Sequence, residues 1–141
     1  MAKEGIIRIF CGEGKGKTSA ALGSAYKNLK EGSIAYILQF NKDENEARLL
    51  ERFDPDIKVF NFDQEMSLNF SKKVIAAKEC DILVLDEILG IIEEDPANEE
   101  IILGLMDLQK KAKISLILTG NNITDRIFEK ADYITEFTRK K

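Results

Sequence analysis

The sequence predicts an α/β fold, a mainly parallel six-stranded sheet with helices on both faces. Short apolar runs alternate with longer segments of helical length, which is the pattern of a parallel sheet covered on both sides. The chain has 141 residues, of which 44% are hydrophobic, so it can enclose one core without disulfides or structural metals. The sequence contains no repeat or linker. We therefore expect residues 1–141 to form a single domain.

Six apolar runs are candidate strands. They are residues 5–10, 34–40, 57–60, 82–85, 114–118 and 133–137. Most consist of Ile, Leu, Val and aromatic residues, which favour the pleated surface of a sheet. Because the segments between the runs are long enough for crossover helices, we expect neighbouring strands to run parallel.

Helical segments fill the intervals between these runs. Residues 18–30 are rich in Ala and Leu and precede Gly32, which can adopt the left-handed conformation that ends helices. Asp95 and Pro96 indicate the N-cap and first position of a second helix, with acidic residues in its first turn and lysines in its last. On that helix we expect one face to pack in the core, formed by Ile101, Leu105 and Leu108.

One interval supports two interpretations. Residues 61–73 contain two phenylalanines, a methionine and a leucine, whose spacing follows neither the helical nor the strand period. The interval is either a surface loop that enters a helix near Ser71 or a segment that faces a ligand.

Charge and composition exclude several classes of protein. The formal net charge is −4, so a polyanion such as DNA would meet no general attraction. No apolar run approaches the roughly 20 residues that span a bilayer, and residues 1–5 do not resemble a secretion signal. We therefore expect a cytoplasmic protein that binds neither nucleic acid nor a membrane.

The spacing of the cysteines and the absence of histidine limit the reactions that the chain could catalyse. Cys11 and Cys80 have no metal-ligand spacing, and the chain has no histidine, the commonest general base. Any reaction must therefore use carboxylates, lysines, hydroxyls, a bound metal or the substrate itself.

A glycine-rich loop joins the first strand to the first helix. It reads Gly12-Glu13-Gly14-Lys15-Gly16-Lys17-Thr18. Its last three residues fit the phosphate-binding pattern G-x-x-x-x-G-K-[ST], the P-loop, and Cys11 stands at the position of the first glycine. Such a loop directs backbone amides and a helix N-terminus at phosphate oxygens.

We expect this loop, together with Ser19, to bind the triphosphate of ATP. Lys17 and Lys15 would supply positive charge, and the Thr18 hydroxyl would be a ligand of Mg²⁺. The three glycines would let the backbone approach the phosphates closely. The alternative is a surface turn that binds nothing.

Two acidic residues complete the predicted site. Residues 82–85 form an apolar strand that runs directly into Asp86 and Glu87. At the carboxyl edge of a parallel sheet, an aspartate in this position lies beside the phosphate loop. We expect Asp86 to hold Mg²⁺ with Thr18, and Glu87 to lie in the outer shell or face the reacting group. The alternative is an ordinary acidic turn after a strand.

Five segments in order resemble one family, the ATP:corrinoid adenosyltransferases. The loop, continued by Ser19-Ala20-Ala21, resembles the family's G-N-G-K-G-K-T-T-A-A, which also lacks the first glycine. The other four are Leu38-Gln39-Phe40 for V-Q-F, residues 84–88 for V-L-D-E-[IL], Leu118-Thr119-Gly120 for I-T-G, and residues 131–136 for A-D-L-V-T-E. The chain resembles a short member without the family's N- and C-terminal extensions. It also has no tryptophan, and Asn121 stands where an arginine commonly follows T-G.

The resemblance implies an alkyl transfer, in which Co(I) of a reduced corrinoid attacks C5′ of ATP and inorganic triphosphate leaves. It implies ATP, Mg²⁺ and a corrinoid as ligands, a homodimer, and Lys17, Asp86 and Glu87 as the catalytic residues. Two alternatives stay open. One is an ATP-binding module of the same fold without transferase activity, such as a sensor or a subunit that needs a partner. The other is a small P-loop ATPase or kinase.

Overall fold

The computed structural model of the chain describes residues 5–40, 47–48, 51–52 and 54–141. A six-stranded sheet forms its centre, in the order β3-β2-β4-β5-β1-β6, and every neighbouring pair runs parallel. The strands are β1 (Ile7–Gly12), β2 (Ala35–Gln39), β3 (Ile57–Phe60), β4 (Ile82–Asp86), β5 (Ser115–Gly120) and β6 (Tyr133–Phe137). The predicted α/β fold with a six-stranded parallel sheet is confirmed.

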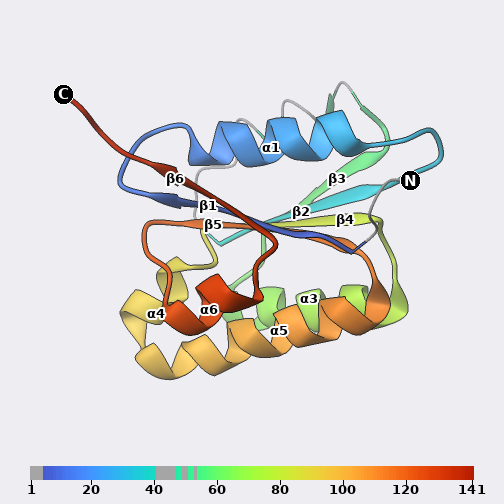
Figure 1. Cartoon of the computed structure of the whole chain (residues 1–141). Coiled ribbons are helices and arrows are strands. Elements are labelled where there is room, and N and C mark those ends of the chain that lie inside the picture. Colours follow the sequence, from blue (N-terminus) through green and yellow to red (C-terminus); the bar gives the residue numbers. More distant parts are fainter. Residues whose placement is uncertain (1–4, 41–46, 49–50, 53) are drawn as a thin grey trace.

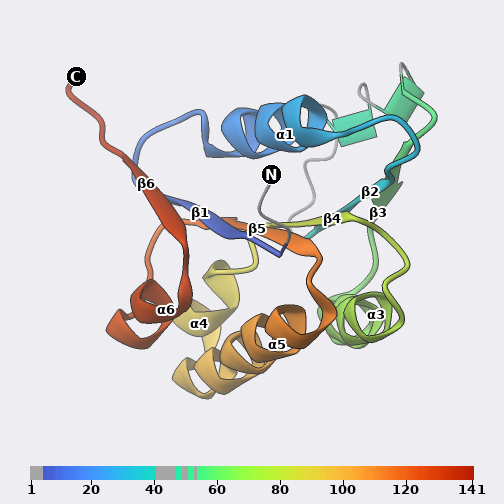
Figure 2. The ribbon, with the colours of Figure 1, turned by 45° about the vertical axis from the view of Figure 1, so that its right-hand side comes forward.

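Helices cover both faces of the sheet, as predicted. One face carries α1 (Lys17–Asn28), and the other carries α3 (Gln64–Ala77), α4 (Gly90–Glu94), α5 (Glu99–Ala112) and α6 (Asp125–Lys130) (Figure 1). The turned view in Figure 2 shows the same three layers, with the sheet between α1 and the other helices. A short 3₁₀ helix, η1 (Pro96–Asn98), leads into α5. Within the described part of the chain, no helix is long and apolar enough to cross a membrane.

Two apolar cores hold these layers together, one on each face of the sheet. Beneath α1, Leu22 belongs to the same buried cluster as Ile37 and Val84. The opposite core contains Leu83 and Leu85 together with buried residues of α3 and α5. Because β4 is covered on both faces, all five of its residues are buried, and residues 82–85 form a continuous apolar run before Asp86.

Some predicted boundaries differ from the structure by one or two residues. β1 begins at Ile7 and extends to Gly12, because Gly12 still pairs with Phe137 of β6. The first helix ends at Asn28 rather than at residue 30. The prediction that Gly32 ends this helix is wrong, since Gly32, with a φ of 84°, lies in the turn before β2.

The interval 61–73 is mostly helix, so the prediction of a loop up to Ser71 is wrong. Asp63 caps α3 by accepting a hydrogen bond from the Met66 amide over 2.8 Å. Two positions on the buried face are Ser67 and Ser71, and the Ser71 hydroxyl donates to the Ser67 carbonyl over 2.8 Å. These polar core residues conceal the helical period in the sequence. The other interpretation, a segment that faces a ligand, stays a prediction.

The helix after Asp95 begins one turn later than predicted. The Asp95 carboxylate caps η1, which then leads into α5. On the predicted core face Leu105 is fully buried, whereas Ile101 and Leu108 are only partly buried. The buried residues of α5 are Ile102, Leu103, Leu105, Met106, Gln109 and Ala112. Gln109 can occupy a core position because its side-chain amide donates to a backbone carbonyl.

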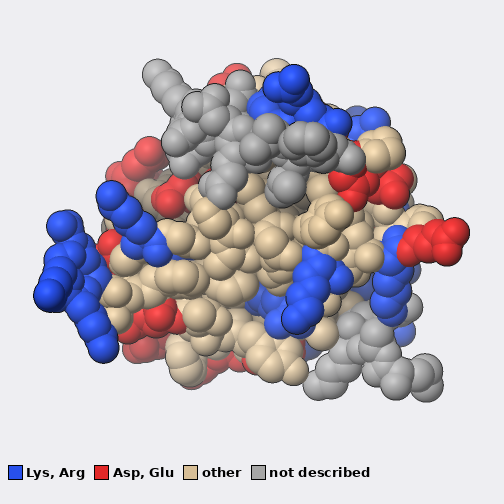
Figure 3. Space-filling view, turned by 90° about the horizontal axis from the view of Figure 1, so that it is seen from above, with Lys and Arg blue, Asp and Glu red and all other residues tan. Residues whose placement is uncertain are grey.

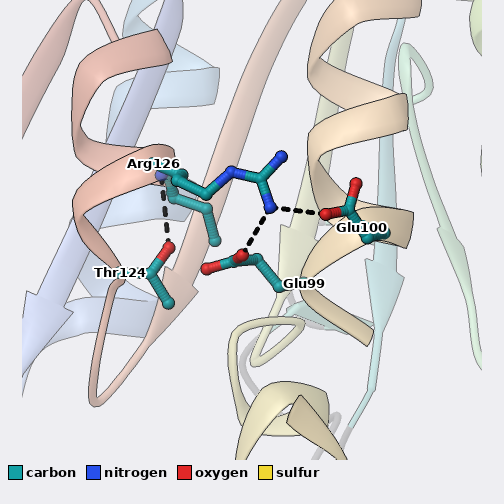
Figure 4. A network of polar contacts seen from close by, with 5 residues as sticks. Glu99, Glu100, Thr124 and Arg126 are labelled. Carbon is teal, nitrogen blue, oxygen red and sulfur yellow. Dashed lines mark hydrogen bonds and ion pairs between the residues drawn. The ribbon is translucent and has the colours of Figure 1, made fainter. Parts of the chain in front are cut away.

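Ion pairs at the surface hold α6 against the start of α5. In Figure 4 the Arg126 guanidinium points toward Glu99 and Glu100, and its Nη1 lies 3.0 Å from Glu99 Oε1. Thr124 caps α6 by accepting a hydrogen bond from the Ile127 amide over 3.3 Å. Exposed pairs of this kind contribute at most about 1 kcal/mol. They link α6 to the start of α5, and α6 leads into β6, which lies beside the glycine-rich loop.

Candidate nucleotide-binding site

The glycine-rich loop joins β1 to α1 at the carboxyl edge of the sheet, where β4 and β5 also end. The first three residues of α1 are Lys17, Thr18 and Ser19. The loop residues exposed to solvent are Glu13, Lys15 and Gly16. This arrangement places the N-terminus of α1 at the edge where parallel α/β sheets bind their ligands.

The loop curls around the side chain of Lys17. The Lys17 ammonium donates to the Gly12 carbonyl over 2.6 Å and to the Gly14 carbonyl over 3.0 Å. Only 9% of the residue is exposed. The buried ammonium therefore lies inside the turn formed by the loop backbone, with its charge held by two carbonyl oxygens.

The glycines of the loop have two different functions. Gly16 has a φ of 103° and is the residue from which α1 starts, a conformation that favours glycine. Gly12 and Gly14 lie against β6: a Cβ on Gly12 would be 2.1 Å from the Phe137 carbonyl oxygen, and one on Gly14 would be 3.0 Å from the Phe137 carbonyl carbon. The Gly14 amide donates to that same oxygen over 3.1 Å. Close packing against Phe137 therefore requires glycine at position 12 and leaves little room for a side chain at position 14.

Asp86 meets the loop from the end of β4. Only 1% of Asp86 is exposed, and the Thr18 hydroxyl lies 3.0 Å from its Oδ1 and 3.3 Å from its Oδ2. These two residues are 68 positions apart in the sequence. The structure thus brings together the two side chains that the sequence analysis assigned to Mg²⁺.

Glu87 follows Asp86 in a strained turn. Its φ of 64° lies in the left-handed region, which is uncommon for a residue with a side chain. Burial raises the pKa of the Glu87 carboxyl group, the charge of Asp86 raises it further, and the Lys17 ammonium lowers it. The carboxyl group of Glu87 is therefore partly buried and within electrostatic reach of both predicted partners.

The sequence analysis gave no role to three other residues at this edge. Thr119, at the end of β5, donates a hydrogen bond from its hydroxyl to Asp86 Oδ1 over 2.7 Å. Gln39, buried at the end of β2, is opposite Asp86 in the strand register. Phe137 contacts the loop as described above. Gln39 and Thr119 are the polar residues at the ends of buried strands, and both lie in segments that resemble the family, but neither was given a role. No sequence pattern signals Phe137.

The donor atoms at this edge fit Mg²⁺. Thr18 and Asp86 offer a hydroxyl and a carboxylate, the hard oxygen ligands that this ion prefers. Among the described residues, no group of three or more His, Cys, Asp or Glu side chains could hold a metal by itself. An ion here would therefore need oxygens from a bound phosphate, which is how Mg²⁺ usually binds in nucleotide sites.

Charge on the face covered by α1 is mixed. In Figure 3, groups of Lys and Arg and groups of Asp and Glu both lie around a mainly uncharged surface, where described residues are drawn. The described residues of this face therefore form no continuous basic stripe of the kind that binds nucleic acid.

The parallel sheet, the loop between β1 and α1, and the carboxylate that ends β4 define a P-loop protein. Comparison with known families gives a more specific result. The family described as ATP:corrinoid adenosyltransferase BtuR/CobO/CobP matches residues 3–141, and the chain belongs to this family. The family suspected from the sequence is confirmed.

Individual relatives agree with this assignment. The chain is 28% identical over 152 residues to a corrinoid adenosyltransferase of Escherichia coli (strain K12), and the match covers 95% of the chain and 76% of the relative. It is 27% identical to corrinoid adenosyltransferase CobA of Salmonella typhimurium (strain LT2), with the same coverage. Among solved structures, a KaiC-like protein from Pyrococcus horikoshii OT3 superposes with a TM-score of 0.65 at 22% identity, covering 84% of this chain and 62% of that one. The last likeness concerns the fold alone.

Proposed function

We propose that this chain is an enzyme that transfers the 5′-deoxyadenosyl group of ATP to Co(I) of a reduced corrinoid and releases triphosphate. The family match carries the proposal, because it spans residues 3–141 and therefore includes the whole glycine-rich loop, Asp86 and Glu87. Relatives named corrinoid adenosyltransferase match over 95% of the chain.

In this reaction the cobalt belongs to the substrate. Its electron pair forms the Co–C5′ bond while the C5′–O bond to the triphosphate breaks, and the electrons of that bond leave with the triphosphate. The protein needs no nucleophile or general base of its own, which fits a chain without histidine. What it must supply is a fixed position for both substrates and positive charge around the leaving group.

The loop residues are suited to hold the triphosphate. We assign this role to Gly12, Glu13, Gly14, Lys15, Gly16, Lys17, Thr18 and Ser19. The Lys17 ammonium, now bonded to two loop carbonyls, would turn toward phosphate oxygens, which carry more negative charge than a carbonyl. The positive end of the α1 dipole favours the same anion, and the exposed Lys15 adds a second cation.

We propose Thr18 and Asp86 as the protein ligands of Mg²⁺. When bound, Mg²⁺ would neutralise part of the charge on the departing triphosphate. The hydrogen bonds that Asp86 accepts orient its carboxylate before any ligand binds. Glu87 would lie in the outer shell or face the reacting group, and with Lys17 and Asp86 it completes the proposed catalytic residues.

Three further expectations are unchanged by the structure and stay predictions. They are a single domain over residues 1–141, assembly as a homodimer, and a location in the cytoplasm.

Product analysis tests the proposed reaction. The purified protein is incubated with ATP, MgCl₂ and cobalamin that has been chemically reduced to Co(I), and corrinoids and nucleotides are separated. Adenosylated cobalamin and triphosphate in equal amounts are expected, and at ATP concentrations below saturation Lys17→Ala should form far less of both. Formation of ADP would instead indicate an ATPase or kinase. ATP binding without product, both from cobalamin and from a corrinoid lacking the lower nucleotide loop, would indicate a binding module without transferase activity.

A further inference from the structure

Thr119 lies at the centre of the candidate site, although no role was assigned to it from the sequence. It belongs to β5, the strand between β1, which enters the glycine-rich loop, and β4, which ends in Asp86. Its register partner on β1 is Phe10, and the preceding Leu118 is opposite Leu85 on β4. The residue is completely buried. A polar side chain in this position requires hydrogen-bond partners.

The Thr119 hydroxyl bridges Asp86, the last residue of β4, and Glu87, which follows it. It donates to Asp86 Oδ1 over 2.7 Å and accepts from the backbone amide of Glu87 over 2.7 Å. A hydroxyl has one proton, and the amide of Glu87 can only donate, so the proton of Thr119 is directed at Asp86. Its bond to Asp86 is also shorter than the bond from Thr18, which measures 3.0 Å.

The backbone of Thr119 also bonds to the turn that follows β4, at Leu89. The Thr119 carbonyl accepts a hydrogen bond from the Leu89 amide over 3.1 Å. The next residue, Gly120, packs so closely that a Cβ on it would lie 2.3 Å from the Leu89 Cβ. The turn of residues 86–89 is therefore bonded to β5 at both ends. Glu87, with a φ of 64°, lies between these two points. A left-handed conformation persists at such a residue only where neighbouring groups hold it.

We propose that Thr119 is a positioning residue of the nucleotide site, which holds the Asp86 carboxylate toward Thr18 and keeps Glu87 in its left-handed conformation. The inference rests on the proposed function. With Mg²⁺ and phosphate bound, the Thr18 oxygen and the Asp86 carboxylate would both be ligands of the ion, so the carboxylate would need a fixed orientation. The proton of Thr119 would still be directed at Asp86, because this hydroxyl is completely buried and its other partner, the Glu87 amide, is itself a donor.

Substitution of the hydroxyl tests the proposal. Thr119→Val keeps the shape of the side chain and removes the hydroxyl, whereas Thr119→Ser keeps the hydroxyl. ATP binding is measured by calorimetry at increasing Mg²⁺ concentrations. For Thr119→Val we expect the Mg²⁺ concentration that gives half of the maximal increase in ATP affinity to rise about tenfold. This is the size expected for the loss of a hydrogen bond to a charged group. ATP binding without Mg²⁺ should change little, and Thr119→Ser should resemble the wild type.

Two controls separate positioning from general stability. Thr124→Val removes a hydroxyl that also accepts a backbone hydrogen bond, at the start of α6, so it should lower stability without changing the Mg²⁺ requirement. In an Asp86→Asn background, Thr119→Val should have no further effect on that requirement, because Thr119 acts through Asp86. An unchanged Mg²⁺ requirement in Thr119→Val, or an equal change in Thr124→Val, overturns the proposal.

A measurement on the unmodified protein covers the case in which Thr119→Val does not fold. The hydrogen bond to Thr119 should protect the Glu87 amide from hydrogen exchange in the nucleotide-free protein, and rapid exchange of that amide overturns the proposal. The wild-type titration separates this inference from the proposed function. If the wild type shows no Mg²⁺-dependent ATP binding, both fail. If the wild type binds ATP with Mg²⁺ and Thr119→Val has the same Mg²⁺ requirement, the positioning role alone fails.

Discussion

The two lysines of the glycine-rich loop should differ sharply in their contribution to ATP binding. Lys17 is buried with 9% of its surface exposed, whereas Lys15 is exposed. Two unit charges 4 Å apart attract by about 4 kcal/mol at the effective dielectric constant near a protein surface, and by about 1 kcal/mol in water. Lys17 must also give up its hydrogen bonds to two loop carbonyls, which offsets about 1–2 kcal/mol. The net contribution of Lys17 is therefore about 2–3 kcal/mol.

We accordingly expect Lys17→Ala to weaken ATP binding about 30- to 150-fold, and Lys15→Ala to weaken it about fivefold or less. Titration calorimetry with ATP and MgCl₂ at physiological salt measures both affinities. Thermal unfolding of each variant shows whether a loss of binding arises from a loss of fold. Equal effects of the two substitutions, or unchanged affinity in a folded Lys17→Ala variant, would refute the reasoning from burial and charge.

The other predictions concern stability. Gly12→Ala should lower the free energy of unfolding by about 2–4 kcal/mol, from the clash with Phe137 and the positive φ. In contrast, Gly23→Ala should raise it by about 0.5–1 kcal/mol, since a Cβ there meets nothing within 4 Å on α1; urea unfolding that ranks the two alike contradicts this. Asp63→Ala should cost about 1 kcal/mol by removing the cap of α3, and no change in the urea midpoint would contradict the cap. Burial raises the pKa of the Cys80 thiol from 9.0 to about 12, so its contribution to stability is complete below pH 9 and is lost as the pH rises toward 12. Between pH 9 and 10.5 the wild type should therefore lose about 1.5 kcal/mol more than Cys80→Ala, and equal losses would contradict the burial.

Much of the fold could be predicted because strands that are buried on both faces of the sheet have continuous apolar sequences. β4 is the clearest case: it is buried along its whole length, and its apolar run identifies it. The helix α3 could not be delimited in the same way, since Ser67 and Ser71 occupy buried positions on its inner face. Gln109 likewise occupies a buried position on α5, so the apolar pattern did not place the buried face of that helix correctly. A polar residue at a core position is invisible to a pattern of apolar residues.

The sequence predicted the main residues of the candidate site, but not the contacts that hold them in place. Lys17 and Thr18 belong to one short motif, and Asp86 follows a recognisable strand, so their types and order are visible in the sequence. The bond between Thr119 and Asp86 joins residues 33 positions apart, and only the strand order places them together. The contact of Phe137 with Gly12 and Gly14 depends in the same way on the pairing of β6 with β1.

A crystal structure of the protein with ATP and Mg²⁺ tests the central claim most directly. We expect the triphosphate to lie along the loop from Gly12 to Thr18, with the Lys17 ammonium turned from the loop carbonyls to the phosphates. Electron density for Mg²⁺ should lie between the Thr18 hydroxyl and Asp86. A nucleotide bound elsewhere, or a triphosphate on the loop with Lys17 still bonded to Gly12 and Gly14, would contradict the account.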